Sequence, residues 1–276
     1  MNYPFITNVQ IRKISNSLVI DEDDQLAVEE PLEIQLLSGN TDNRAQKSIS
    51  VTMRTPGHDE ELAAGFLFTE GIIRSNQEIL FIEQETFDGN KILVGLQENV
   101  IPDIQKMERN FYTTSSCGVC GKSSIDAIKT VSVYNMEPDE ICLKADMFYH
   151  IHYAVREKQV LFKSTGGLHA SALFDMEGNF IMLREDIGRH NALDKVIGAS
   201  LLNEELPLNK TILLLSGRAS FELIQKACMA GIKVITAVGA PSSLAVELAK
   251  ECNMTLIGFL RDERFNIYSG EQRIIL

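Results

Sequence analysis

The stretch that decides the fold runs from residue 211 to residue 259 and reads TILLLSGRASFELIQKACMAGIKVITAVGAPSSLAVELAKECNMTLIGF. Three apolar runs in it are typical of buried strands: 211–215, 233–238 and 255–259. Two segments with helical spacing lie between them, at 220–230 and 242–252. Strands and helices that alternate at this interval predict parallel strands joined by right-handed crossovers. We therefore expect an α/β fold with a β-α-β-α-β unit.

The residues upstream of this unit extend the sheet. Segments 170–174 and 180–183 are predicted to form a hairpin around Glu177-Gly178-Asn179. Apolar residues at helical spacing predict one helix that starts near Ile187 and another, amphipathic helix over 147–162.

The first hundred residues are rich in short strands. Residues 47–55 alternate in polarity, which predicts a strand with Ile49, Val51 and Met53 on its buried side. Segments 79–85 and 91–97 are predicted to pair through a turn at 88–90.

A helix is predicted between these strands. Asp59 is expected to cap its start, and Glu70 and Gly71 mark its end.

Composition and charge limit the classes of partner. The chain has 276 residues, of which 45% are hydrophobic and 23% are charged, as in an ordinary soluble globular protein. No apolar run reaches the roughly 20 residues that a membrane helix needs, and residues 1–13 do not resemble a secretory signal. The net charge of −12 repels nucleic acid. We therefore expect a cytoplasmic protein that binds neither membrane nor nucleic acid, with the acidic run 21–24 on a solvated face or loop.

Small and basic residues follow each of the three parallel strands. They are Ser216, Gly217 and Arg218 after the first strand, Gly239 to Ser243 after the second, and Arg261, Asp262, Glu263 and Arg264 after the third. Ligands of parallel sheets bind beyond the carboxyl ends of the strands, and helix starts there suit phosphate. The pattern predicts a pocket for a phosphorylated ligand, although the same residues also serve as helix caps and tight turns.

Two more polar stretches are candidates for a site. The first is 184–191, in which Asp194 stands four residues after His190 and is positioned to orient its imidazole. Its alternative interpretation is a helix start with surface charges. The second is 165–169, where two glycines precede His169, which alternatively is a satisfied buried histidine.

The most specific local signal is the loop 112–124, which contains Cys117 and Cys120. Five cysteines without a secretory signal favour thiols over a disulfide framework. A thiol pair at this spacing is able to bind metal, cycle as a disulfide or pass sulfur. No second pair is near enough to complete a zinc site within the chain, which leaves intersubunit zinc open. Lys122 nearby would lower a thiol pKa and favour the nucleophilic form.

Zinc deaminases carry His-x-Glu followed by Pro-Cys-x-x-Cys. Here Ser171 stands where the glutamate is needed, and the cysteine pair lies upstream of His169. Deaminase chemistry is therefore not supported.

Several long motifs resemble the formate dehydrogenase accessory sulfurtransferases, the FdhD family. They are GFLFTEGII (65–73), NFYTTSSCGVCGKSSI (110–125), TGGLHASALF (165–174), REDIGRHNALDKVIG (184–198), LLLSGRASFELIQKA (213–227) and GAPSSLAVELA (239–249). The resemblance covers most of the chain from about residue 30 onward.

The resemblance implies a fold and a domain organisation. A smaller N-terminal α/β part would occupy 1–111 and a flexible loop 112–124. A cytidine-deaminase-like α/β domain, which would hold the predicted β-α-β-α-β unit in a mixed sheet, would occupy 125–276.

The resemblance also implies a function. A cysteine desulfurase would supply sulfur as a persulfide on Cys117, with Cys120 as its partner. The sulfur would pass to a molybdenum or tungsten bis-guanine-dinucleotide cofactor that serves formate dehydrogenase. The segment Phe259, Leu260, Arg261, Asp262, Glu263 and Arg264 would bind this cofactor, guanine nucleotide would mimic it, and the protein would be a homodimer. Ser216, Gly217, Arg218, Gly239 and His190 are further candidates for cofactor binding.

Three alternatives stay open beside the sulfurtransferase. A chaperone for the cofactor or for formate dehydrogenase would not need Cys117. A redox protein would form and reduce a disulfide between Cys117 and Cys120. A nucleotide-binding structural protein would not interact with the desulfurase.

Overall fold

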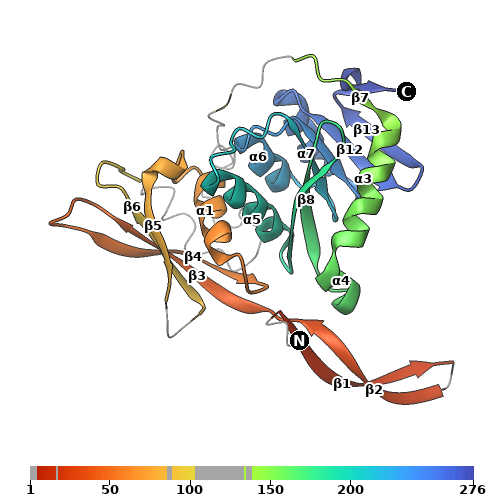
Figure 1. Cartoon of the computed structure of the whole chain (residues 1–276), viewed down its shortest axis with the longest axis horizontal. Coiled ribbons are helices and arrows are strands. Elements are labelled where there is room, and N and C mark those ends of the chain that lie inside the picture. The colour runs from red at the N-terminus through yellow and green to blue at the C-terminus, as the bar shows by residue number, and fades with distance from the viewer. Residues whose placement is uncertain (1–4, 17, 86–88, 103–133, 135–138) are drawn as a thin grey trace.

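The chain is a mixed α/β protein, as predicted. Its structure, a computed structural model, describes residues 5–16, 18–85, 89–102, 134 and 139–276 (Figure 1). The main sheet has the strand order β13-β12-β11-β10-β8-β9. Its strands are β8 (His169–Asp175), β9 (Phe180–Asp186), β10 (Thr211–Leu215), β11 (Val234–Ala237), β12 (Thr255–Arg261) and β13 (Arg264–Ser269).

The predicted β-α-β-α-β unit is confirmed. Strand β10 pairs parallel with β11, and β11 pairs parallel with β12. Helices α6 (Phe221–Met229) and α7 (Ser243–Glu251) connect them. The hairpin of β8 and β9 is also confirmed, and β8 joins β10 in antiparallel fashion, which makes the sheet mixed.

Each face of the main sheet is covered by helices. Helix α3 (Ala145–Lys158) packs on one face, and α5 (Arg189–Leu202), α6 and α7 cover the other (Figure 1). Side chains alternate between faces along a strand. Accordingly, Leu213 and Leu215 of β10 face the helices α5 and α6, whereas Ile212 and Leu214 face α3.

One predicted helix is divided in two. The helical pattern over 147–162 corresponds to α3 and a short α4 (Val160–Thr165), which are separated at Gln159. The backbone N–H groups of Leu161 and Phe162, at the start of α4, donate to the carboxylate of Glu185 at 3.1 and 2.9 Å. This carboxylate satisfies donors that a helix start leaves without partners, which stabilises the new start.

A four-stranded sheet forms the N-terminal part of the fold. Its order is β4-β3-β6-β5, with β3 (Glu30–Ser38), β4 (Ala45–Arg54), β5 (Ile79–Gln84) and β6 (Lys91–Leu96). The predicted antiparallel pair of β5 and β6 is confirmed, and β3 runs parallel to β6.

The predicted buried side of β4 is wrong beyond Ile49. The pairing of β3 with β4 shifts register between Ile34 and Gln35, so that Ile49 is an extra residue in β4. A β-bulge of this kind reverses which side of the strand faces the core. Ile49 is buried, whereas Val51 and Met53 are 57% and 43% exposed.

Helix α1 (Asp59–Thr69) packs against α5 and joins the two sheets (Figure 1). Its N-cap is His58, so the prediction that Asp59 caps the helix is wrong. Asp59 instead binds the buried Arg54 through two hydrogen bonds of 3.1 Å. Gly71 follows the end of the helix with a φ of +70°, as a glycine stop signal predicts.

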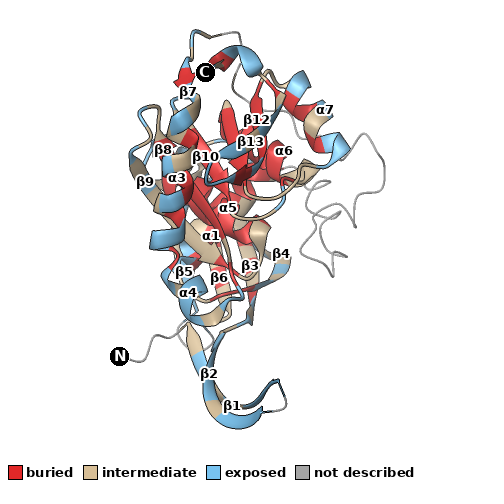
Figure 2. Cartoon of the chain, turned by 90° about the vertical axis from the view of Figure 1, so that its right-hand side faces the viewer, coloured by how far each residue is buried: buried red, intermediate tan, exposed pale blue. Residues whose placement is uncertain are grey.

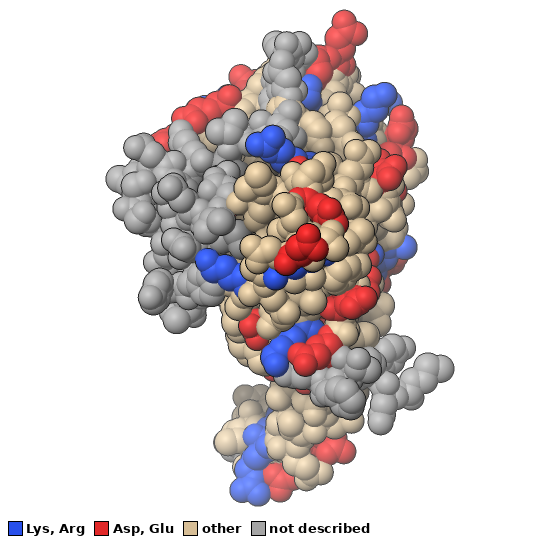
Figure 3. Space-filling model, turned by 90° about the vertical axis from the view of Figure 1, so that its left-hand side faces the viewer, with Lys and Arg blue, Asp and Glu red and all other residues tan. Residues whose placement is uncertain are grey.

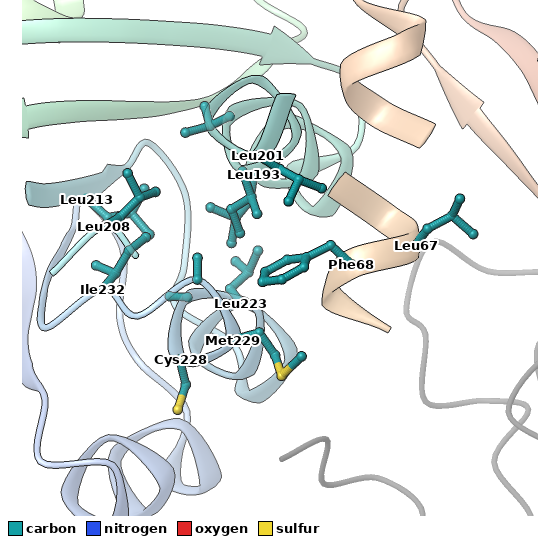
Figure 4. Close-up of a cluster of buried hydrophobic side chains, with 14 of the residues drawn as sticks. Leu67, Phe68, Leu193, Leu201, Leu208, Leu213, Leu223, Cys228, Met229 and Ile232 are labelled. Atoms are coloured by element: carbon teal, nitrogen blue, oxygen red, sulfur yellow. The ribbon is translucent and has the colours of Figure 1, made fainter. Parts of the chain in front are cut away.

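One of the two buried apolar clusters is continuous across both sheets. Phe68 of α1 lies beside Leu193 and Leu201 of α5 and Leu223 of α6 (Figure 4). Buried residues run through the centre of the molecule from the four-stranded sheet to the main sheet (Figure 2). The predicted loop 112–124 lies outside the described residues, and the likeness to cytidine deaminases stays a prediction.

A two-stranded arm precedes the four-stranded sheet and is absent from our predictions. Strands β1 (Ile6–Ser15) and β2 (Leu18–Ala27) pair with each other and project from the body (Figure 1). In the space-filling view this arm is the narrow part at the bottom of the molecule (Figure 3). The acidic run 21–24 lies on β2 and faces solvent, as expected. Asp21 and Glu22 form ion pairs with Arg12 and Lys13 across the arm.

Two short strands complete the fold: β7 (Leu143–Lys144) and β14 (Ile274–Ile275) pair in parallel near the C-terminus. Among the described residues, no helix has both the length and the apolar character to cross a membrane.

Candidate ligand site at the strand ends

The residues that follow β10 and β11 lie side by side, as the sequence predicts. The backbone N–H of Gly239 donates to the carbonyl of Gly217 at 2.8 Å, and the N–H of Phe259 donates to the carbonyl of Gly239 at 3.1 Å. Ser216 accepts a hydrogen bond of 2.7 Å from the N–H of Ala170, which attaches the start of β8 to the same edge. Helices α5 and α6 also begin at this edge, so segments from distant parts of the sequence meet here.

Close backbone contact explains one glycine of the edge. A Cβ on Gly239 would lie 2.9 Å from backbone atoms of Arg218, which is too close for any other residue. The ring of His169 lies beside Gly217, where an added Cβ would be 3.2 Å from Nδ1. The glycines therefore bring the two loops and His169 together.

The edge carries a concentration of positive charge. Burial lowers the pKa of the half-buried His169, and the neighbouring Arg189, His190 and Arg218 lower it further. Asp186 opposes this effect. Because the protein as a whole is acidic, this local positive field is what an anionic ligand would meet.

A histidine and a carboxylate from two helix starts face each other at this edge. Nε2 of His190, at the start of α5, lies 3.9 Å from Oε2 of Glu222 in the first turn of α6. The interaction with His190 is the largest cause of the low pKa of Glu222, about 2, and burial opposes it. The imidazole is 7% exposed, and Nε2 is within hydrogen-bonding distance of no described partner. The distance of 3.9 Å is that of an ion pair rather than of a hydrogen bond, and Nε2 itself is buried.

We define the strand-end site as His169, Arg189, His190, Ser216, Gly217, Arg218, Glu222 and Gly239. Glu222 is absent from the sequence predictions, because its partner is 32 residues away along the chain and no spacing rule connects them.

Most of the polar stretch 184–191 stabilises the fold. Arg184 forms a two-pronged ion pair with Glu61 of α1, at 2.6 and 2.7 Å. Asp186 is fully buried, 2.7 Å from Lys195. Of this stretch, Arg189 and His190 are the residues that contribute to the strand-end site. Both interpretations of 184–191 are therefore incomplete: it is neither a helix start with surface charges nor a motif that belongs wholly to a site.

The prediction that Asp194 orients His190 is wrong. The carboxylate of Asp194 accepts hydrogen bonds from Lys226 at 2.9 and 3.0 Å and from Thr69 at 2.9 Å. Although it stands one turn after His190, it faces α1 and α6, and the carboxylate that lies near His190 is Glu222.

The predicted cofactor segment 259–264 divides between three environments. Phe259 is 42% exposed and adjoins Gly239, with a φ of +54° that is unusual for a bulky side chain. Leu260 is fully buried in the apolar cluster beneath α3. Arg261 donates to the carbonyl of Val238 at 2.7 Å, next to the strand-end site.

The second half of this segment turns toward α3. Asp262 lies 3.8 Å from His152 and 4.0 Å from Arg156, both on α3. Arg264 is exposed and pairs with Arg261 across the turn between β12 and β13, and Glu263 lies exposed within that turn. The structure thus places Phe259 and Arg261 next to the strand-end site, and it places Leu260, Asp262, Glu263 and Arg264 elsewhere.

Cys117 and Cys120, the predicted catalytic residues, lie outside the described residues. Within the ranges that the structure describes, no three His, Cys, Asp or Glu side chains are grouped so as to hold a metal ion.

The sequence matches known proteins over nearly its whole length. The model of the FdhD/NarQ family matches residues 27–275. The sulfur carrier protein FdhD of Streptomyces avermitilis is 47% identical over 97% of this chain and 95% of its own length. The protein of the same name from Picrophilus torridus is 41% identical over 94% of this chain and 97% of its own.

A solved structure agrees with these relatives. The crystal structure of a Desulfotalea psychrophila protein, described as a formate dehydrogenase accessory protein, superposes with a TM-score of 0.74 at 25% identity. The match covers 99% of this chain and 100% of that one. On the evidence of motifs, fold and sequence match together, the chain belongs to the FdhD/NarQ family.

Proposed function

We propose that this protein is a sulfur carrier that serves formate dehydrogenase. It accepts sulfur from a cysteine desulfurase and passes it to a molybdenum or tungsten bis-guanine-dinucleotide cofactor, which is its substrate. The observation that carries the proposal is the family match over residues 27–275, together with relatives above 40% identity that are named sulfur carriers. We further propose that it acts in the cytoplasm as a homodimer.

The sulfur chemistry belongs to Cys117 and Cys120. The thiolate of Cys117 attacks the outer sulfur of the desulfurase persulfide, the S–S bond breaks, and the desulfurase leaves as a thiolate. Cys117 then carries the persulfide. On delivery, Cys120 attacks the inner sulfur, a Cys117–Cys120 disulfide forms, and the outer sulfur leaves as hydrosulfide for the metal. The two cysteines supply the electrons of this step, so the cycle closes when a thiol reductant reduces the disulfide.

The strand-end site fits a guanine nucleotide end of the substrate. Pyrophosphate is an anion that favours backbone approach through glycine, arginine side chains and helix starts. Gly217, Gly239, Arg218 and His190 supply these features at one edge of the sheet. Guanosine diphosphate is therefore a suitable probe of this site.

Intact-protein mass spectrometry tests sulfur loading. After incubation with a cysteine desulfurase and cysteine, the wild type is expected to gain about 32 Da, the mass of one sulfur atom, and to lose it on reduction. The gain is expected to vanish in Cys117→Ala and to persist in Cys142→Ala, whose thiol is exposed on the surface. A wild type that gains no mass but binds guanosine diphosphate would favour the cofactor chaperone.

Calorimetric titration with guanosine diphosphate tests the strand-end site. Arg218→Ala is expected to weaken binding about tenfold or more, because it removes a charge-assisted contact to phosphate. Arg12→Ala, on the projecting arm, is the matched control and is expected to bind as the wild type does. Equal affinity in both variants would show that the nucleotide binds elsewhere.

A further inference from the structure

Two cysteines outside the predicted catalytic pair lie against each other. Sγ of Cys228, near the end of α6, is 2.9 Å from Sγ of Cys252, the residue that follows α7. They are 24 residues apart in sequence, and their helices pack side by side. Cys228 belongs to the apolar cluster, and its sulfur lies at the edge of the cluster, pointing away from the other labelled side chains (Figure 4).

We propose that Cys228 and Cys252 are a reversible oxidative modification site, at which a hydroperoxide converts the two thiols into a disulfide. A disulfide needs its sulfur atoms about 2.05 Å apart, so the pair must close by roughly 0.9 Å. Each cysteine lies at the end of a helix, where the backbone adjusts more readily than within a helix. This proposal rests on no part of the proposed function.

The environments of the two thiols assign their roles. Cys252 is partly exposed, whereas Cys228 is 8% exposed and lies against Cys252. Cys228 donates its S–H to the sulfur of Cys252, and this hydrogen bond and burial raise the pKa of Cys228 well above its usual range. Cys252 is therefore the thiol that meets the oxidant, and Cys228 is held protonated beside it until the second step.

The chemistry balances in two steps. The sulfur of Cys252 attacks one oxygen of hydrogen peroxide, the O–O bond breaks, and hydroxide leaves and takes a proton to become water. Cys252 is now a sulfenic acid. Cys228 then loses its proton and attacks the sulfur of Cys252, the S–O bond breaks, and the oxygen leaves as a second water. Two thiols lose two electrons in total, and one peroxide gains them.

The buried partner also protects Cys252. A sulfenic acid without a nearby thiol is oxidised further to sulfinic acid, which ordinary thiols do not reverse. With Cys228 in contact, the sulfenic acid is captured as a disulfide that a dithiol reductant reopens.

Peptide mapping of the full-length protein after peroxide treatment tests the proposal. Trypsin cleavage after Lys and Arg places Cys228 in peptide 227–233, Cys252 in 251–261 and the loop cysteines in 110–122. We expect a cross-linked species of 227–233 with 251–261 that dithiothreitol removes. Cys142, which is exposed, is expected to stay out of this species and serves as the internal control.

The single variants Cys228→Ala and Cys252→Ala test the role of each thiol. In Cys228→Ala, Cys252 is expected to gain two oxygen atoms, about 32 Da, that dithiothreitol does not remove. In Cys252→Ala, Cys228 is expected to remain alkylatable after unfolding. The proposal is overturned if wild-type Cys228 and Cys252 both remain alkylatable at a peroxide dose that oxidises Cys252 in Cys228→Ala. A cross-link of 251–261 with 110–122 in place of 227–233 would also overturn it.

Discussion

Helices α5 and α6 share a buried ion pair. Lys226 of α6 lies 2.9 Å from Asp194 of α5, and the side chains are 9% and 3% exposed. Removal of one partner leaves the other charge buried without compensation. We expect Lys226→Met to lower the free energy of unfolding by about 3–5 kcal/mol in urea titrations.

The double variant Asp194→Leu/Lys226→Met is expected to be less destabilised than Lys226→Met, because the buried charge of Asp194 is removed as well. Glu70, which lies 3.5 Å from Lys226 and whose side chain is 13% exposed, loses the same partner in both variants. Lys13→Met removes one partner of an exposed ion pair on the arm and should leave unfolding almost unchanged. Equal losses in Lys226→Met and Lys13→Met would contradict this account.

The pair of Glu222 and His190 predicts a pH dependence. The pKa of Glu222 falls from 4.5 to about 2 in the folded protein. A lowered carboxylate pKa stabilises the fold above the unfolded-state pKa, and this contribution disappears as the pH falls from about 4.5 to about 2. Glu222→Gln should therefore lower the melting temperature near pH 6, and the difference from wild type should shrink across this range.

Melting curves between pH 2 and pH 7 measure this effect. Glu247→Gln, which changes an exposed glutamate of α7, is the control and should follow the wild type at every pH. A difference between Glu222→Gln and wild type that stays constant with pH would exclude the ion pair as its origin.

Some residues of the strand-end site were predictable from the sequence and others were not. Ser216, Gly217, Arg218 and Gly239 were predictable as neighbours because parallel strands end at one edge of a sheet. The partner of His190 was not, because spacing along one helix identifies which residues share a face but not which neighbouring helix that face meets. Helix spacing proposed Asp194, whereas packing between α5 and α6 supplies Glu222.

Helices α1 and α5 cross at two glycines. A Cβ on Gly65 would overlap the carbonyl of Asp194, and a Cβ on Gly198 would overlap the carbonyl of Glu61. Backbone atoms on both sides leave no flexible side chain that would move aside. We therefore expect Gly65→Ala to lower the free energy of unfolding by at least about 2 kcal/mol, although alanine favours helices.

Gly167→Ala is the matched control for this crossing. An added Cβ there would meet nothing nearer than the carbonyl of Thr165, 3.9 Å away. Urea unfolding of Gly167→Ala should lie within about 0.5 kcal/mol of the wild type. If Gly65→Ala were equally mild, the two helices would have room to separate.

Among the helices and strands, those with a regular pattern of buried residues were predictable from the sequence. The unit β10-α6-β11-α7-β12 was predictable because its strands are apolar throughout and its helices are amphipathic. The arm was not, because both faces of β1 and β2 are largely exposed and no alternation results. The bulge at Ile49 was not predictable either, because the alternation rule assumes a regular strand.

The whole molecule divides into a body, which holds two apolar clusters, and an arm outside them. Of the buried core residues in the described part of the chain, none lies on β1 or β2. Ile14, Leu18 and Val19 near the tip are 70%, 59% and 56% exposed. An isolated hairpin of two strands is marginally stable at best, so the body holds the arm and the arm contributes little to the body.

Replacement of residues 9–24 by Asn-Gly tests this division. The two residues suit the tight turn that would join Asn8 to Gln25, which face each other across the arm. The base of the arm is retained, including the hydrogen bond of 2.9 Å from the N–H of Val28 to the carbonyl of Phe5. We expect the melting temperature to change by less than about 2 °C, because the deletion removes no core side chain. A fall of more than about 5 °C would mean that the arm packs against apolar surface in solution, and the division of the molecule into core and arm would then be wrong.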